Sequence, residues 1–245
     1  MLNWASGTHE ADHGIGGLGD TVQTVSDLTL PGPAPSALAR PAWRGRMHTW
    51  AFFVTIPAGL IVLIAADGAA ARVVTAIYTA TLLAGFGVSA AYHRLAESPR
   101  ARTIMQRLDH SMIYLWIAGT YVPLSVIALP PRWGVPLLIV VVSGAVLGVF
   151  VKMVAFDRWR WLGYSLYPIL GWTAIAAAPA LWRYLSTPVL VLVVAGGLLY
   201  SVGVPVLFTR RPDPWPRTFG YHEVWHGFTV AAAGLHFAAI SLVVI

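Results

Sequence analysis

The chain has 245 residues, of which 57% are hydrophobic and 11% are charged, and its formal net charge is +6. This composition is too apolar for a soluble domain, and no polar face gathers the basic residues as a nucleic-acid-binding surface would. The sequence contains no cysteine, which excludes disulfide bonds and thiolate metal ligands, so any transition metal would depend on histidine and carboxylate groups.

Residues 1–40 differ from the rest of the chain. Gly, Pro, Ser, Thr and Asp dominate them, and the segment Pro31-Gly-Pro-Ala-Pro35 is incompatible with a helix. We predict a disordered cytoplasmic tail. Four of its residues are of types found in metal sites, but we interpret them as solvated because no scaffold holds them: His9, Glu10, Asp12 and His13.

Seven runs without a charged residue follow the tail. Each has at least 19 residues, and a helix needs about 20 to cross the hydrocarbon core of a bilayer. We therefore predict an all-α membrane protein whose residues 41–245 form a seven-transmembrane helix bundle. The runs are Met47–Ala66, Val73–Tyr92, Ser111–Leu129, Trp133–Val151, Trp161–Trp182, Tyr184–Thr209 and Val224–Ile245.

The basic residues fall almost entirely into alternate loops. Of the 16 Lys and Arg residues, 13 lie before the first run or in the second, fourth and sixth loops, and the exceptions are Arg72, Arg132 and Arg183. The positive-inside rule then places the N-terminus in the cytoplasm and the C-terminus outside. We expect a multi-pass protein of the inner or plasma membrane, surrounded by membrane lipids.

Ionisable residues lie at the ends of three of these runs. His93 follows the second run, Asp109 precedes the third, and His222 and His226 lie at the start of the seventh. The predicted topology puts all four at the level of the inner-leaflet interface. Ionisable groups at the edge of a bilayer are costly, and they are commonly functional.

These residues have the composition of a zinc site with an open position. His222 and His226 are four residues apart, so they lie on one face of a helix, about 6 Å apart along its axis. With His93 they would provide three nitrogen donors, and zinc would lower the pKa of a bound water to about 7. Asp109 could orient or deprotonate that water, and Ser89, one turn before His93, could bind the water or an oxyanion.

Structural interpretations of the same residues remain open. A pair of histidines at a membrane interface can form a polar belt only, and Ser89 can serve helix packing. The shared level of His93 and Asp109 favours the metal site. We interpret His110, about 100° around the helix from Asp109, as a loop-facing hydrogen-bonding residue, and His48 as interfacial.

The segment His222-Glu-Val-Trp-His226 also matches H-E-x-x-H, a zinc-protease motif in which the glutamate, here Glu223, is the general base. Such proteases usually take their third ligand from a position downstream of the motif. His236 is the one histidine that follows here, about 15 Å deeper, so His93 would have to serve from far upstream. An intramembrane metalloprotease is therefore the less favoured interpretation.

Three groups of residues, in this order and spacing, resemble the hemolysin III family, the bacterial branch of the progestin and adipoQ receptor superfamily, which includes the adiponectin receptors. The likeness covers about residues 40–245. The matching segments are Ser89-Ala-Ala-Tyr-His93-Arg94; Leu108-Asp109-His110 with Ile117-Ala-Gly-Thr-Tyr-Val-Pro123; and His222-Glu-Val-Trp-His226 with Ala231-Ala-Ala-Gly-Leu-His236.

The resemblance implies a seven-helix bundle with zinc near its cytoplasmic side. The implied ligands are His93, His222 and His226, with Asp109 holding the zinc-bound water and Ser89 nearby. It also implies kinship with ceramidase-like membrane hydrolases, which cleave lipid amides, and a role in membrane-lipid homeostasis. The hemolysin name suggests a cytolysin or pore, but this sequence has no amphipathic pore-forming segment.

We therefore expect an integral membrane zinc protein that hydrolyses lipid amide or ester bonds at the inner leaflet. The alternative is a non-enzymatic membrane-state sensor or receptor-like protein in which zinc joins the second and seventh spans. A lipid substrate would need a chamber beneath the metal. Ser89 and His236 should point into that chamber, and Gly85, Gly87 and Gly234 should leave room for it.

Overall fold

The computed structural model describes residues 41–245, so the tail predicted for residues 1–40 lies outside the described residues. Apart from an isolated β-bridge between Trp215 and Phe219, the regular structure of the described residues is helical. In chain order the elements are α1 (Arg46–Ala65), α2 (Gly68–Leu95), α3 (Pro99–Pro123), the π-helical turn η2 (Leu124–Ala128), α4 (Pro131–Val154), α5 (Arg160–Gly171), the 3-10 segment η3 (Trp172–Ala177), α6 (Ala178–Tyr184), α7 (Thr187–Thr209) and α8 (Tyr221–Val244).

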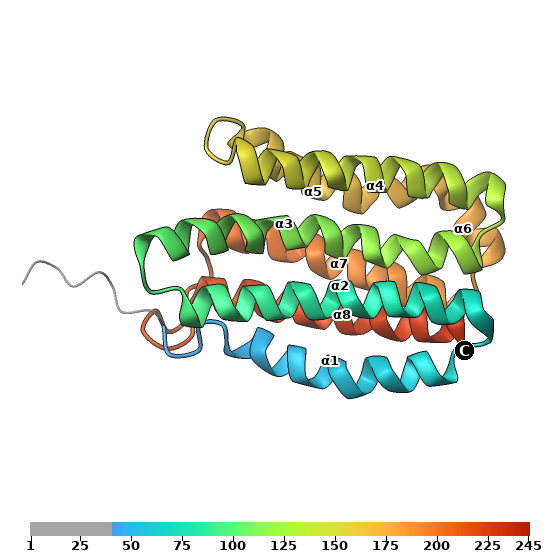
Figure 1. The fold of residues 1–245 in the computed structure, drawn as a ribbon, viewed down its shortest axis with the longest axis horizontal. Coiled ribbons are helices and arrows are strands. Elements are labelled where there is room, and N and C mark those ends of the chain that lie inside the picture. The colour runs from blue at the N-terminus through green and yellow to red at the C-terminus, as the bar shows by residue number, and fades with distance from the viewer. Residues whose placement is uncertain (1–40) are drawn as a thin grey trace, which may run out of the picture. The chain divides into compact units, whose positions relative to one another are not determined.

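Within the described residues, six elements are long and apolar enough to cross a membrane: α1, α2, α3 with η2, α4, α7 and α8. These helices run side by side (Figure 1). Large apolar side chains lie exposed on them, among them Trp50, Ile64 and Val146, which are 66%, 69% and 63% exposed. An apolar surface of this kind marks contact with lipid. The predicted all-α, multi-pass membrane bundle is confirmed, while its sidedness stays a prediction from the charges.

The fifth predicted span is not one helix. Residues 160–184 form α5, η3 and α6 in succession, and η3 begins four residues after Pro168. A proline inside a helix removes a backbone hydrogen bond and its ring clashes with the preceding turn, which favours a break close by. Six continuous helices and this divided element therefore replace the seven uninterrupted helices that we predicted.

The loop between the second and third runs is much shorter than the gap between these runs, Val73–Tyr92 and Ser111–Leu129. Only three residues separate α2 from α3, and Ser98 caps α3 by accepting a hydrogen bond from the backbone N–H of Ala101 at 3.1 Å. A charge-free run marks the apolar part of a helix, whereas the helix itself extends with its arginines into the polar interface. Asp109 consequently lies well inside α3 rather than at its start.

The packing order brings the last helix back to the first three. α1 packs against α2, α2 against α3 and α3 against α4, while α8 packs against α7 and contacts α1, α2 and α3. A buried apolar cluster that includes Leu82, Phe86 and Ile240 joins α2 to α8. Because α2 ends where α3 and α8 begin, residues from these three helix ends meet at one end of the bundle.

Candidate metal centre

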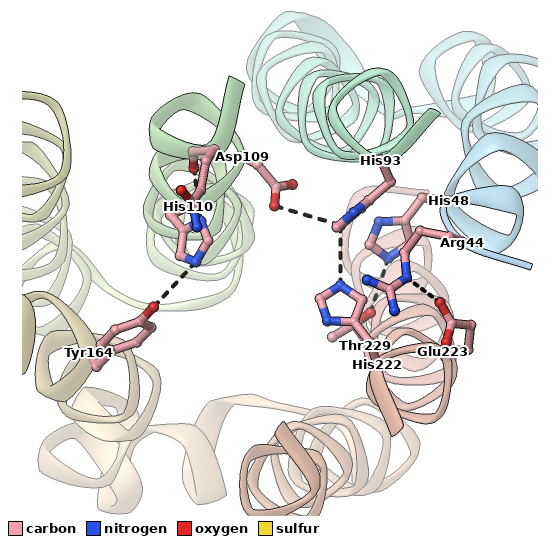
Figure 2. Close-up of polar contacts among 10 residues, drawn as sticks. Arg44, His48, His93, Asp109, His110, Tyr164, His222, Glu223 and Thr229 are labelled. Carbon is pink, nitrogen blue, oxygen red and sulfur yellow. Dashed lines mark hydrogen bonds and ion pairs between the residues drawn. The ribbon is translucent and has the colours of Figure 1, made fainter. Parts of the chain in front are cut away.

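Three histidines meet at this end of the bundle. His93 comes from the last turn of α2, and His222 and His226 come from the first two turns of α8. One nitrogen from each ring lies within 4.8 Å of the other two, and the Nε2 atoms of His93 and His222 are 3.2 Å apart (Figure 2). His93 and His226 are buried, at 7% and 4% exposure. The structure thus brings the three predicted ligands together, and metal binding itself stays a prediction.

The start of α8 is fixed by hydrogen bonds that use Glu223. The backbone N–H of Gly220 donates to Glu223 Oε2 at 2.9 Å, which caps the helix. Arg44, which precedes α1, donates to Glu223 Oε1 at 2.5 Å (Figure 2). Both carboxylate oxygens of this buried residue are therefore engaged, Oε2 by Gly220 and Oε1 by Arg44.

This arrangement removes the basis of the protease interpretation. In the H-E-x-x-H motif the glutamate must face the metal-bound water to act as a general base. Glu223 instead caps its own helix and pairs with Arg44. The carboxylate that accompanies the histidines is Asp109 of α3, whose Oδ2 lies 3.9 Å from His93 Nε2 (Figure 2).

Asp109 lies beside Ser89. The Ser89 side chain, which is 5% exposed, lies within hydrogen-bonding reach of the Asp109 side chain, which is 16% exposed. A serine hydroxyl can donate to an ionised carboxylate, so Ser89 is placed to orient Asp109. The predicted site residues of α2 and α3 therefore form one connected group.

A fourth histidine belongs to this cluster and was not predicted. The ring of His48, in the first turn of α1, stacks on the ring of His226 with centroids 3.9 Å apart and planes 2° apart. His48 is only 5% exposed, so at this helix end its ring faces the interior of the bundle. No sequence pattern indicates this contact, because it depends on the packing of α1 against α8, which are far apart in the chain.

Hydrogen bonds assign the tautomer of His48. The Thr229 hydroxyl donates to the backbone carbonyl of His226 at 2.9 Å, and His48 Nε2 lies 3.2 Å from the same hydroxyl oxygen (Figure 2). Since the hydroxyl proton is already used, Nε2 is the donor in the second contact. His48 Nδ1 then carries a lone pair, and within residues 41–245 this buried atom has no hydrogen-bond partner.

Two further histidines lie outside the cluster. His110 Nδ1 donates to the carbonyl of Gln106 at 2.8 Å, and its Nε2 lies 3.4 Å from the hydroxyl of Tyr164 on α5. His110 thus forms hydrogen bonds as predicted, and its ring contacts both α5 and the loop before it, where the ring centroids of His110 and Phe156 are 5.3 Å apart. His236 Nε2 donates to the carbonyl of Val193 on α7 at 3.1 Å, so this residue links the last two helices.

The room expected beneath the metal is partly filled. A Cβ atom at Gly85 would lie 2.9 Å from the ring of Trp116, and one at Gly87 would lie 3.1 Å from the ring of Phe52. These two glycines admit aromatic side chains, so the prediction that they leave space is wrong. A Cβ atom at Gly234 would meet open space.

The chemistry of the three histidines, and the spacing of two of them, fit a metal ion such as zinc, while all three donor atoms lie within 4.8 Å of one another. Neutral imidazole nitrogens are preferred zinc ligands, with bonds of about 2.0 Å, and two ligands of one tetrahedral zinc are then about 3.3 Å apart. The 3.2 Å separation of the Nε2 atoms of His93 and His222 matches this value. Two unbonded imidazole nitrogens facing each other at this distance need a proton or a cation between them.

The fold and the site together define a multi-pass helical membrane protein with a histidine cluster near one end of its bundle. A family model described as haemolysin-III related matches residues 36–237. The chain is 31% identical over 196 residues to Hemolysin-3 of Bacillus cereus, covering 79% of this chain and 86% of that protein. It is 30% identical over 196 residues to the Hemolysin-3 homolog of Bacillus subtilis (strain 168), covering 79% and 89%. The chain belongs to the hemolysin III family, and it is a multi-pass protein of the cell membrane.

Proposed function

We propose that the protein is a zinc-dependent hydrolase of lipid amide or ester bonds that acts at the inner leaflet and serves membrane-lipid homeostasis. The observation that carries this proposal is the meeting of three imidazole donors with a carboxylate from a third helix. Three histidines with an open fourth position are typical of catalytic zinc sites. Bound zinc would supply a Lewis acid and a water molecule that ionises near neutral pH.

Residues of the protein would bind the metal, transfer the proton and position the groups that react. His93, His222 and His226 would hold the metal, and the stacking of His48 on His226 keeps one of these rings in a fixed orientation. Asp109 lies where it can take a proton from the attacking water and return it to the leaving group. The position of Ser89 beside Asp109 supports a role in orienting this carboxylate, besides the contact with the water or an oxyanion that the sequence suggested.

A lipid substrate is favoured by the position of the site. The cluster lies at the helix ends of a bundle that offers apolar surface along its sides and has short loops, so molecules of the bilayer are its nearest neighbours. A carbonyl near a lipid headgroup reaches about the depth of these helix ends. A soluble substrate would need a polar domain to bind it, and within residues 41–245 the segments outside the helices are too short to form one.

A structural role of zinc is the second candidate, and a specific observation favours it. The metal would join α2 to α8, while Trp116 and Phe52 fill the space beside Gly85 and Gly87. In that case the protein is a non-enzymatic membrane-state sensor or receptor-like protein. The two candidates share the ligands and differ in the role of Asp109.

The discriminating experiment uses purified protein with its zinc content measured, incubated with vesicles that contain amide-linked or ester-linked lipids. For an enzyme we expect product from the parent, loss of product on chelation and recovery with added zinc. Asp109→Asn should keep its zinc and lose at least about 100-fold in rate, because the general base is removed. Zinc-loaded parent that cleaves neither lipid class would support the structural role instead.

A further inference from the structure

An open groove of about 640 Å³ lies between the start of α5, the loop before it and the end of α7. Its lining combines positive charge with large aromatic side chains. The lining includes Asp157, Arg158, Arg160, Trp161, Tyr164 and Phe208. None of these residues belongs to the histidine cluster, so the properties of this groove do not depend on a bound metal.

The two arginines of this groove are available to an anion. Arg158 and Arg160 are exposed, and among residues 41–245 neither side chain takes part in an ion pair. The Arg160 guanidinium lies over the ring of Tyr164, 5.8 Å from its centroid. Asp157 adds one negative charge to the lining without pairing with either arginine. The groove therefore keeps a net positive charge.

The apolar part of the groove continues along membrane-spanning elements. Trp161 is 72% exposed and Phe208 is 61% exposed, and they come from α5 and α7 respectively. In a bundle surrounded by bilayer, such side chains contact acyl chains at the level just below the headgroups, where tryptophan is enriched. The positive charge at the helix ends matches the phosphate of a phospholipid headgroup, and the apolar surface beside it matches the acyl chains.

The same combination occurs on a second flank of the bundle. A groove of about 340 Å³ between α1 and α2 is lined by Arg46, Arg94, Trp50 and Phe53, together with a threonine. Both grooves lie at the end of the bundle that carries most of the basic residues, the predicted cytoplasmic end. Anionic lipids give the cytoplasmic leaflet its negative surface potential, and each nearby Arg or Lys adds attraction to it.

We propose that the groove beside α5 binds an anionic phospholipid of the cytoplasmic leaflet. Arg158 and Arg160 contact its phosphate and headgroup charge, and Trp161 and Phe208 contact the upper part of its acyl chains. The occupant is a lipid rather than a soluble anion, because the exposed aromatic surface gains from acyl chains and not from free phosphate. Bound in this way, the lipid seals α5 to α7 at the end of the divided span.

The absence of cysteine from the sequence makes a direct test simple. Ser165, which also lines the groove, is replaced by Cys and carries a photoreactive cross-linker as the sole thiol adduct. The labelled full chain is placed in vesicles that contain equal amounts of tagged phosphatidylglycerol and tagged phosphatidylcholine. Illumination then reports which lipid occupies the groove.

We expect the cross-linker to capture phosphatidylglycerol in preference to phosphatidylcholine. Each arginine contributes about fivefold to this preference, so Arg158→Gln with Arg160→Gln should reduce it by about 25-fold. Asp157→Asn removes the negative charge of the lining and should increase the preference about fivefold. Inorganic phosphate, compared with chloride at equal ionic strength, should leave the preference unchanged.

A matched control exists at the other end of the bundle. Arg132 donates to the hydroxyl of Tyr184 at 3.0 Å, and Arg183 lies over the ring of Tyr184 at 5.8 Å, the same spacing as Arg160 over Tyr164. Arg132→Gln with Arg183→Gln should keep the preference within twofold of the parent. Equal capture of both lipids by the parent, an equal effect of both double variants, or displacement by phosphate would each overturn the proposal.

Discussion

The ring of His226 lies among three other histidine rings. The centroids of His48, His222 and His93 are 3.9, 4.5 and 5.0 Å from that of His226. His222 and His93 are the predicted co-ligands of His226, whereas His48 contacts His226 as a stacked neighbour. Because outer contacts of a metal-ligating histidine fix its orientation, they strongly affect metal affinity. His48 is therefore expected to support the metal site without coordinating the ion.

Replacing His48 tests this role. His48→Ala should weaken zinc binding by about tenfold, because His226 loses the ring that holds its plane. His48→Phe should recover part of the affinity, since it restores the stacking and not the hydrogen bond to Thr229. The measurement is a zinc titration against a chromophoric chelator.

His236→Phe is the control for this titration. This variant changes a histidine that lies on α8, as His226 does, but forms its hydrogen bond with the carbonyl of Val193 on α7. If His48→Ala binds zinc as tightly as His236→Phe and the parent, the stacked pair has no part in the site.

Some contacts of the candidate site could be predicted from the sequence, and others could not. The spacing of His222 and His226 on one helix face is local, and the level of His93 and Asp109 follows from span order and charge. The contact of His48 and the pairing of Glu223 with Arg44 depend instead on how α1 and the residues before it pack against α8. Periodicity and charge carry no information on such distant contacts, so the role of Glu223 could be decided only in three dimensions.

At the scale of elements, apolar runs predicted most spans closely. Met47–Ala66 corresponds to α1 (Arg46–Ala65), and Trp133–Val151 to α4 (Pro131–Val154). The run Trp161–Trp182 was free of charged residues like the others, yet it is divided. Prolines did not distinguish it, because α1, α4 and α7 also contain internal prolines and remain continuous. Instead, the division of this span depends on hydrogen-bond partners for the backbone N–H and C=O groups that a break in the helix exposes.

Tyr121 of α3 provides these partners. Its hydroxyl lies 3.1 and 2.8 Å from the carbonyl oxygens of Leu170 and Gly171, at the end of α5, and the backbone N–H of Ala174 donates to it at 2.9 Å. In hydrocarbon, backbone groups without hydrogen bonds are costly, so a broken helix within the bilayer must be satisfied by neighbouring side chains. One buried hydroxyl therefore stabilises the junction between α5 and η3.

Tyr121→Phe is expected to destabilise the protein by about 2 kcal/mol, because it leaves buried backbone groups without partners. The apparent unfolding temperature of the purified protein in detergent would report this loss. Tyr184→Phe, which removes a hydroxyl that accepts a hydrogen bond from the exposed Arg132, should shift that temperature far less. Equal shifts for the two variants would show that Tyr121 does not support the divided span.

At the scale of the whole molecule, sidedness rests on the basic residues. Of the 15 Lys and Arg residues within residues 41–245, 12 lie at the end that carries the histidine cluster, and this end is predicted to face the cytoplasm. The chain lacks cysteine, so single cysteines can report the sidedness. Ser98→Cys lies between α2 and α3 at this end, and Ser186→Cys lies between α6 and α7 at the other.

In intact cells, a membrane-impermeant maleimide should label Ser186→Cys and spare Ser98→Cys. Permeabilised cells should show labelling of both. The opposite pattern in intact cells would place the histidine cluster at the outer leaflet, and both the inner-leaflet substrate and the lipid groove would then be assigned to the wrong side.

We propose that His93, His222 and His226 bind zinc, and the metal content of the purified protein shows whether they do. The parent should contain about one zinc ion per chain. His222→Ala and His226→Ala should each lose most of it, while Asp109→Ala should retain more than either, because Asp109 stands beside the three nitrogen donors. If all three variants, correctly folded, bind zinc as the parent does, the metal site lies elsewhere and the account is contradicted.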